Sequence, residues 1–241
     1  NNNGKLEPWN MTEEKYNELF PLVDRFTTAQ GKDDCYMISV INSIYQNPRT
    51  RGKYYKMFEQ VGDDIKVTIP AYKEYGGPIV FEKGIIPSNT TGAAAAKHVR
   101  MFEQSYARTS LRSGKKISLE KNPLTTDDIN FLQNRIGGGR QEDVIKELFP
   151  EELQIGNFSQ GNIYNKSDIE YFLKNYAGND RYIVTEAFKT GIDGGHAVSI
   201  TGFNPKEKLV KVVDPNNFGT QKEIPLDEFE KNFIDFVFMR V

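Results

Sequence analysis

The spacing of apolar residues changes along the chain from a helical pattern to a strand-like one. Before about residue 150, apolar side chains recur every three or four positions, in segments that end near glycine or proline. After about residue 180, short runs rich in β-branched residues alternate with turn residues. This order predicts an α+β protein in which a mostly helical part precedes a mostly sheet-forming part.

The first part is expected to hold most of the helices. They are predicted at residues 12–20, 35–47, 49–58, 94–111, 127–135 and 141–149, with strands at 65–72 and 79–81. The helix from Cys35 is apolar on most of its surface, so it should be central and buried. Asp33 or Asp34 can cap its start, and Pro48 ends it.

The second part is expected to build an antiparallel sheet. Strands are predicted at residues 181–188, 196–203, 208–214 and 235–241, and helices at 167–176 and 226–232. We divide the chain into an N-terminal extension (1–28), a helical lobe (29–150) and a β-rich lobe (151–241).

The charge balance and hydropathy argue against two classes of partner. Lysine and arginine number 31 against 33 acidic residues, which gives a net charge of −2 and no basic field for nucleic acid. No apolar run approaches the roughly 20 residues of a membrane span. The first residues lack the basic and apolar regions of a secretory signal, and the compartment remains open. We expect a monomer that binds neither nucleic acid nor membrane.

The chain has one cysteine, Cys35, and two histidines, His98 and His196. An intrachain disulfide is therefore impossible, and the spacing gives no zinc motif. The acidic pairs Asp63–Asp64 and Asp127–Asp128 lack the spacing of a calcium loop. We therefore expect no cofactor, and the sequence does not support calcium dependence.

Three residues lie where elements begin or end. Cys35 opens a predicted helix, whose N-terminus can stabilise a thiolate and hold an oxyanion. His196 follows Gly194-Gly195 and opens a strand, and Asp214 ends the strand 209–213 before Pro215. Each residue alone has an ordinary structural explanation, as a packed thiol, a strand end or a turn. Together they have the composition of a nucleophile, a base and an orienting carboxylate.

Several stretches resemble the calpain catalytic core, within the papain-like cysteine proteases. The stretch QGKDDCYMISVINSI resembles the segment around the family's nucleophile, and GGHAVSITGF resembles the segment around its histidine. The stretch LVKVVDPNNFG is similar to the strand that carries the third catalytic residue. Weaker likenesses lie in HVRMFEQSYAR and IGGGRQEDVIKELFP. The resemblance runs from about residue 26 to the end.

The resemblance implies a two-lobed papain-like fold and a cysteine endopeptidase that acts on proteins or peptides. Cys35 would be the nucleophile, His196 the base and Asp214 the third residue, where the family has asparagine. Asn216 is the alternative third residue, and Gln30 falls near the family's oxyanion glutamine. The family's tryptophan after the third residue is absent.

Two other functions remain open from the sequence. A transglutaminase, a deamidase or a deubiquitinase would use the same triad on one protein substrate. A catalytically inactive binding module is the second alternative, although the intact Cys35 and His196 count against it. His98 is expected on a helix, on its surface or in the core.

Overall fold

The computed structural model describes residues 11–20, 35–73, 78–86, 97–109, 139–152, 154–159, 166–189, 195–215 and 221–241. Within these ranges the protein is a mixed α+β structure with two antiparallel sheets and seven α-helices. None of the described helices is long and apolar enough to cross a membrane.

The smaller sheet belongs to the first part of the chain. Its strands follow the order β1 (Phe58–Val61), β2 (Asp64–Val67) and β3 (Ile79–Phe81). The helices of this part are α1 (Glu13–Leu19), α2 (Cys35–Gln46), α3 (Pro48–Tyr55), α4 (Lys97–Thr109) and α6 (Gln141–Leu148), with short 3-10 turns η1 (Pro70–Tyr72) and η2 (Glu82–Gly84).

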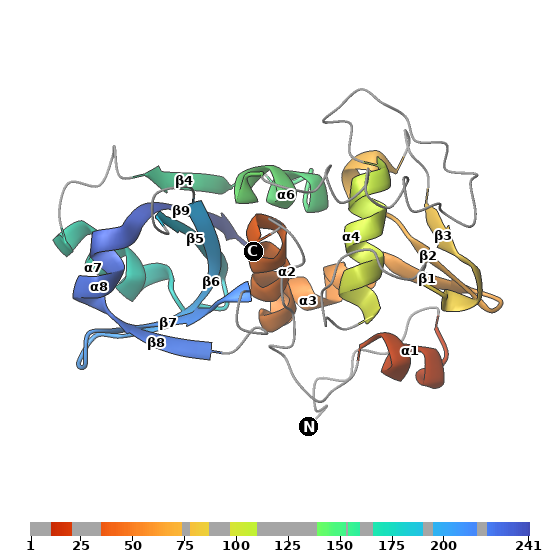
Figure 1. The fold of residues 1–241 in the computed structure, drawn as a ribbon, viewed down its shortest axis with the longest axis horizontal. Helices are drawn as coiled ribbons and strands as arrows, with labels where there is room; N and C mark the ends of the chain where they lie inside the picture. The colour runs from red at the N-terminus through yellow and green to blue at the C-terminus, as the bar shows by residue number, and fades with distance from the viewer. Residues whose placement is uncertain are drawn as a thin grey trace.

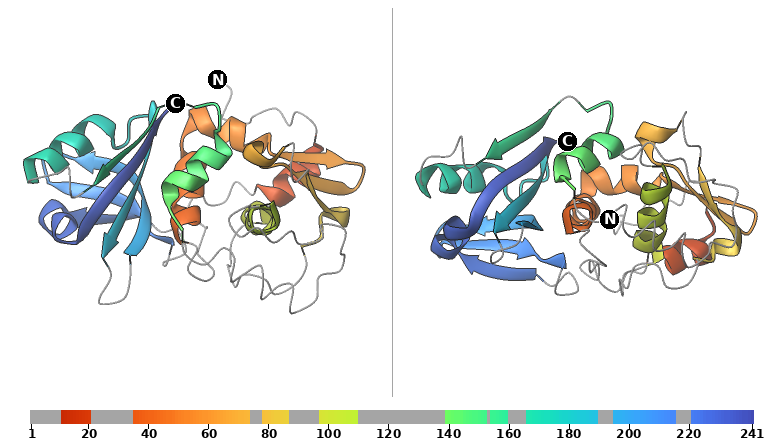
Figure 2. Two further views of the ribbon diagram at one scale, coloured as in Figure 1. Left: turned by 90° about the horizontal axis from the view of Figure 1, so that it is seen from above. Right: turned by 45° about the horizontal axis from the view of Figure 1, so that its top comes forward.

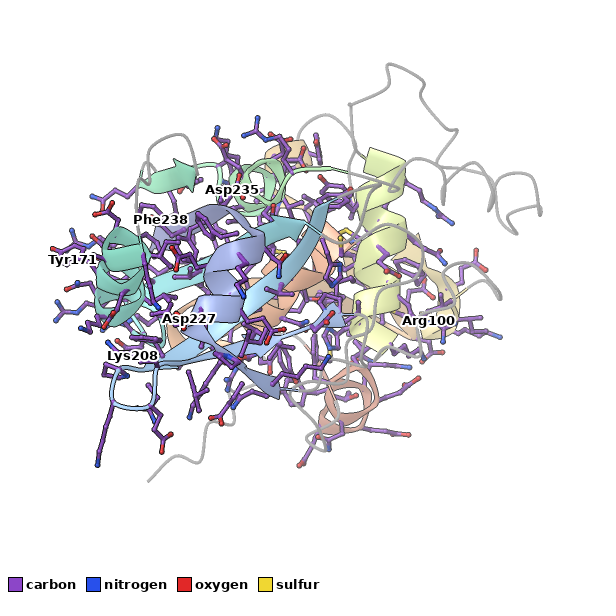
Figure 3. All side chains as sticks on the ribbon, turned by 60° about the vertical axis from the view of Figure 1, so that its left-hand side comes forward. Arg100, Tyr171, Lys208, Asp227, Asp235 and Phe238 are labelled. Carbon is purple, nitrogen blue, oxygen red and sulfur yellow. The ribbon has the colours of Figure 1, made fainter. Side chains whose placement is uncertain are left out.

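The larger sheet has six strands in the order β4-β9-β5-β6-β7-β8. These strands are β4 (Ile155–Ser159), β5 (Tyr182–Lys189), β6 (Gly195–Asn204), β7 (Leu209–Val213), β8 (Gln221–Pro225) and β9 (Phe233–Arg240). Helices α7 (Lys166–Tyr176) and α8 (Leu226–Asn232) cover its outer face, where they share a core cluster with residues of β5, β6, β7 and β9. Figure 3 shows Tyr171, Lys208 and Asp227 on this outer side.

Helix α2 lies between the two sheets (Figures 1 and 2). Its aliphatic side chains are fully buried, namely Met37, Ile38, Val40, Ile41 and Ile44. A helix that is apolar over most of its surface must be covered on most sides, which explains its central place. Each such side chain contributes about 1.5–3 kcal/mol through burial. The other face of the six-stranded sheet packs on this same core through residues such as Ala197 and Val237.

Helix α1 is built into the core of the first part. Thr12 caps it by accepting a hydrogen bond from the Lys15 backbone N–H, and Leu19 and Phe20 are 0% and 1% exposed. The Phe20 ring packs against Tyr55 at a centroid distance of 4.4 Å. Part of the expected N-terminal extension is therefore an integral element of the fold, while its expected boundary at residue 28 lies outside the described residues.

Hydrogen bonds join the far end of α2 to the six-stranded sheet. The hydroxyls of Ser43 and Ser199 are 2.6 Å apart. Asn47 donates from its side-chain amide to the carbonyls of Asp180 and Tyr182, at 3.0 and 3.1 Å. The serine contact is buried and the two Asn47 hydrogen bonds are partly buried, and together they hold the helix against β5 and β6. We call this set of contacts the α2–sheet seam.

Replacing Asn47 by alanine is expected to lower the free energy of unfolding by about 2–3 kcal/mol. The side chain also accepts a hydrogen bond of 2.8 Å from the Arg49 N–H and so caps α3. The variant loses this cap and two hydrogen bonds to the sheet. Urea denaturation measures the loss. Asn175→Ala is the matched control, because Asn175 is exposed and its side-chain amide donates to the Tyr171 carbonyl of its own helix.

The Asn175 variant should change the free energy of unfolding by less than about 0.5 kcal/mol. Equal losses in the two variants would show that the seam adds no stability of its own.

Several predicted elements are confirmed, and others differ. Helices α1, α6, α7 and α8 and strands β3, β5, β6 and β7 lie at the expected places within a few residues. The helix expected to reach Phe58 ends at Tyr55, because Phe58 is the first residue of β1. The strand expected to reach Tyr72 ends at Val67. Pro70 instead opens the 3-10 turn η1. The helix predicted at 127–135 lies outside the described residues.

Candidate active site

Cys35 is the first residue of α2 and is partly buried against the core. The first N–H groups of an α-helix have no partner within the helix, so they point outward at its start. Together with the helix dipole they favour negative charge on a side chain or ligand placed there. Cys35 therefore sits where a thiolate and an oxyanion can be stabilised.

His196 lies at the beginning of β6, one residue after the strand starts at Gly195. It pairs with Phe188 of β5 in the antiparallel ladder, and its side chain is 6% exposed. The apolar strand that follows it, with Ala197 and Val198 both buried, anchors the backbone on either face of the sheet. A buried imidazole on a central strand has a fixed position, as a catalytic base requires.

Asp214 follows directly after β7, whose last residue is Val213. Ser199 pairs with Val213 across the β6–β7 ladder, so continuing the register places Asp214 diagonal to His196 on the same face. The Asp214 Oδ1 atom lies 2.7 Å from His196 Nε2. The side chain of Asp214 is 16% exposed, so this contact is partly shielded from water.

The imidazole of His196 has two partners. Cys35 forms a side-chain hydrogen bond with it, and because Asp214 occupies Nε2, the nitrogen left for the thiol is Nδ1. Burial lowers the pKa of His196, but the hydrogen bonds to Asp214 and Cys35 and their negative charges outweigh it and raise this pKa to about 9. The three side chains thus form one connected array, in the order thiol, imidazole and carboxylate.

This array can hold an imidazolium beside a thiolate. An imidazole whose pKa lies near 9 keeps a proton at neutral pH, and the thiolate is the reactive form of cysteine.

The raised pKa of His196 also makes the stability of the fold depend on pH. Since the folded pKa lies above that of a free histidine, the protonated ring stabilises the fold below about pH 6.5 and this contribution is lost as the pH rises through 9.

A further charged residue, Lys222, reaches Asp214 and was not predicted from the sequence. Its Nζ lies 3.7 Å from Asp214 Oδ2. Lys222 belongs to β8. This strand was not predicted from the sequence, because four of its five residues are exposed and its apolar alternation is weak. Only the pairing register of the β7–β8 hairpin reveals the contact.

His98 lies elsewhere and does not join the array. Its Nδ1 shares a hydrogen bond of 2.9 Å with the Tyr54 hydroxyl, and its ring stacks on Tyr45 at 5.3 Å. Burial lowers its pKa to about 3, so the ring is neutral. The expectation that left His98 between surface and core is settled in favour of the core.

Two residues that the resemblance implicates cannot be placed. Gln30, the candidate oxyanion donor, and Asn216, the alternative third residue, both lie outside the described residues. Over the described part of the chain, no group of three or more His, Cys, Asp or Glu residues is arranged to hold a metal ion.

Comparisons with known proteins add no relative. No protein-family model matches the chain, and no curated protein sequence matches it. A functional assignment therefore depends on the geometry of Cys35, His196 and Asp214, together with the sequence resemblance.

Proposed function

We propose that the chain is a cysteine peptidase with a papain-like arrangement of two lobes, closest to the calpain catalytic core. The supporting observation is the array of Cys35, His196 and Asp214. These residues come from α2, β6 and the end of β7, and the first two are 161 residues apart in the sequence. The only cysteine of the chain thus contacts one of its two histidines, which in turn contacts a carboxylate at 2.7 Å.

The first half of the proposed reaction forms an acyl-enzyme. His196 holds the proton of Cys35, and the thiolate sulfur attacks the carbonyl carbon of a peptide bond. The backbone N–H groups at the start of α2 can stabilise the resulting oxyanion, with Gln30 as the expected second donor. When the tetrahedral intermediate collapses, the C–N bond breaks and His196 gives its proton to the leaving amine.

The second half releases the acid. His196 takes a proton from water, the hydroxide adds to the thioester carbonyl, and the C–S bond breaks. The sulfur leaves as a thiolate beside the imidazolium, which restores the starting pair. Asp214 accepts from Nε2 and holds the ring with Nδ1 toward the sulfur.

A thiol-directed probe and a peptide library test this proposal. An irreversible peptidyl electrophile should label wild-type protein at Cys35 far faster than it labels the same cysteine in the urea-unfolded chain. Mass spectrometry of the peptide library should then show products of hydrolysis. Labelling no faster than in the unfolded chain would refute an activated Cys35.

Adding a primary amine to the library separates hydrolysis from acyl transfer. A transglutaminase would couple the amine to glutamine side chains, and a deamidase would convert glutamine to glutamate, in both cases without chain cleavage. Either result would reject the peptidase while keeping the triad.

We predict that hydrolysis proceeds without added calcium. The α2–sheet seam holds the helix that carries Cys35 against the sheet that carries His196, so the two residues already meet. A chelator should therefore leave the initial rate unchanged, and millimolar calcium should raise it by less than about twofold. Activity that appears only with calcium would instead indicate a calpain-like switch, with ligands drawn from scattered oxygens.

A further inference from the structure

The β7–β8 hairpin carries Lys222 to the carboxylate that orients His196. Lys222 pairs with Val212 in the ladder, and Asp214 lies two residues beyond Val212 on the same face of the sheet. Lys222 and Asp214 are therefore diagonal neighbours, within reach of a long side chain. The Lys222 Nζ lies 3.7 Å from Oδ2, while His196 Nε2 lies 2.7 Å from Oδ1. Each carboxylate oxygen of Asp214 thus has its own partner.

We propose that Lys222 is a positioning residue that acts through Asp214 on the Cys35–His196 pair, an inference that rests on the proposed function of that pair. The ammonium group fixes the second carboxylate oxygen, which restrains rotation of Asp214 about its side-chain bonds. It also offsets part of the negative charge that Asp214 presents to the imidazole. The chain has a carboxylate where the resembled family has a neutral amide, and Lys222 brings that carboxylate closer to neutrality.

The expected size of the effect follows from simple electrostatics. A unit positive charge on the far side of the carboxylate from the ring, in surroundings close to water in dielectric response, lowers the pKa of the imidazolium by about half a unit. The Lys222 side chain is 45% exposed, so a larger shift is not expected. Removing the charge should therefore raise the pKa of His196.

Among the residues that the structure describes, the charged groups around the pair come from three elements. Cys35 faces the ring from α2, Asp214 from the end of β7, and Lys222 from β8. Lys211 and Glu223 of the same hairpin pair with one another, with Lys211 Nζ 3.7 Å from Glu223 Oε1. That ion pair has the same N–O distance as the Lys222–Asp214 pair and a lysine of similar exposure, 40% against 45%, and strand alternation places it on the opposite face of the hairpin. It supplies a matched control.

The NMR resonances of the two histidine rings, followed against pH, measure the pKa of His196 directly. His98 is buried with a pKa lowered to about 3, so His196 is the histidine that titrates at neutral and alkaline pH. Lys222→Met should raise the measured pKa of His196 by about half a unit. Lys222→Arg keeps the charge and should leave it within about 0.2 units of wild type, as should Lys211→Met.

An unchanged pKa in Lys222→Met, or an equal shift in Lys211→Met, overturns the inference. The readout needs no substrate, so its failure is distinct from failure of the proposed function. If the pKa shifts as expected but no peptide is cleaved, the electrostatic link from Lys222 through Asp214 to His196 is confirmed and the peptidase is rejected. If peptides are cleaved, the alkaline limb of the rate profile should move upward with the pKa.

Discussion

Replacing Cys35 by alanine is expected to reduce peptide hydrolysis by at least about 10⁴-fold. Cys35 carries the only thiol in the chain, and the proposed acyl intermediate forms on its sulfur. Alanine keeps the helix start, since it has high helix propensity and removes a single sulfur from a partly buried position. The free energy of unfolding should therefore change by less than about 1.5 kcal/mol. Initial rates and urea denaturation together separate the two effects.

Ser39→Ala is the matched control for this variant. Ser39 lies one turn further along α2, is fully buried, and donates a hydrogen bond of 3.0 Å to the Tyr36 carbonyl of the same helix. Its loss should leave the rate within about threefold of wild type, because no contact with His196 or Asp214 is removed. If the Cys35 variant kept its hydrolytic activity, the nucleophile would be another residue and the whole mechanism would be wrong.

The sequence predicted those elements best whose apolar residues follow a clear period. Helix α8 lies at Leu226–Asn232 as expected, because its buried residues Leu226 and Phe229 are three positions apart on one face. Strand β8 was missed for the opposite reason, since most of its residues are exposed and polar. Strand β1 was missed because a helix was expected to continue to Phe58, although Gly62 at φ +61° turns the chain between β1 and β2.

The residues of the candidate site also fall into two groups, those that the sequence pattern indicates and those that it does not. Cys35, His196 and Asp214 could be proposed from the sequence, because each stands at the end of a strongly patterned element and matches the resembled family's order. The seam residues and Lys222 could not be proposed, because their contacts depend on how distant elements pack. The bond between Ser43 and Ser199 joins residues 156 apart, and the Lys222 contact depends on the hairpin register.

Replacing Asp214 by alanine is expected to reduce the rate of hydrolysis by about 10²–10⁴-fold. The variant removes the acceptor 2.7 Å from His196 Nε2, which fixes the ring with Nδ1 toward Cys35. It also removes a hydrogen bond and a negative charge that raise the pKa of His196, while burial continues to lower it. The imidazolium then loses its proton at a lower pH, so the alkaline limb of the rate profile should move from near pH 9 toward neutrality.

Two further variants show which property of Asp214 matters and whether Asp214 is the third residue. Asp214→Asn keeps an acceptor oxygen without the charge, so it should retain more activity than alanine while still moving the alkaline limb downward. Asn216→Ala should reduce the rate by less than about tenfold, because the carboxylate at position 214 already occupies Nε2. A larger loss for Asn216 than for Asp214 would identify Asn216 as the residue that orients the imidazole. In that case the ion pair of Asp214 with His196 would contribute to the fold and not to the reaction.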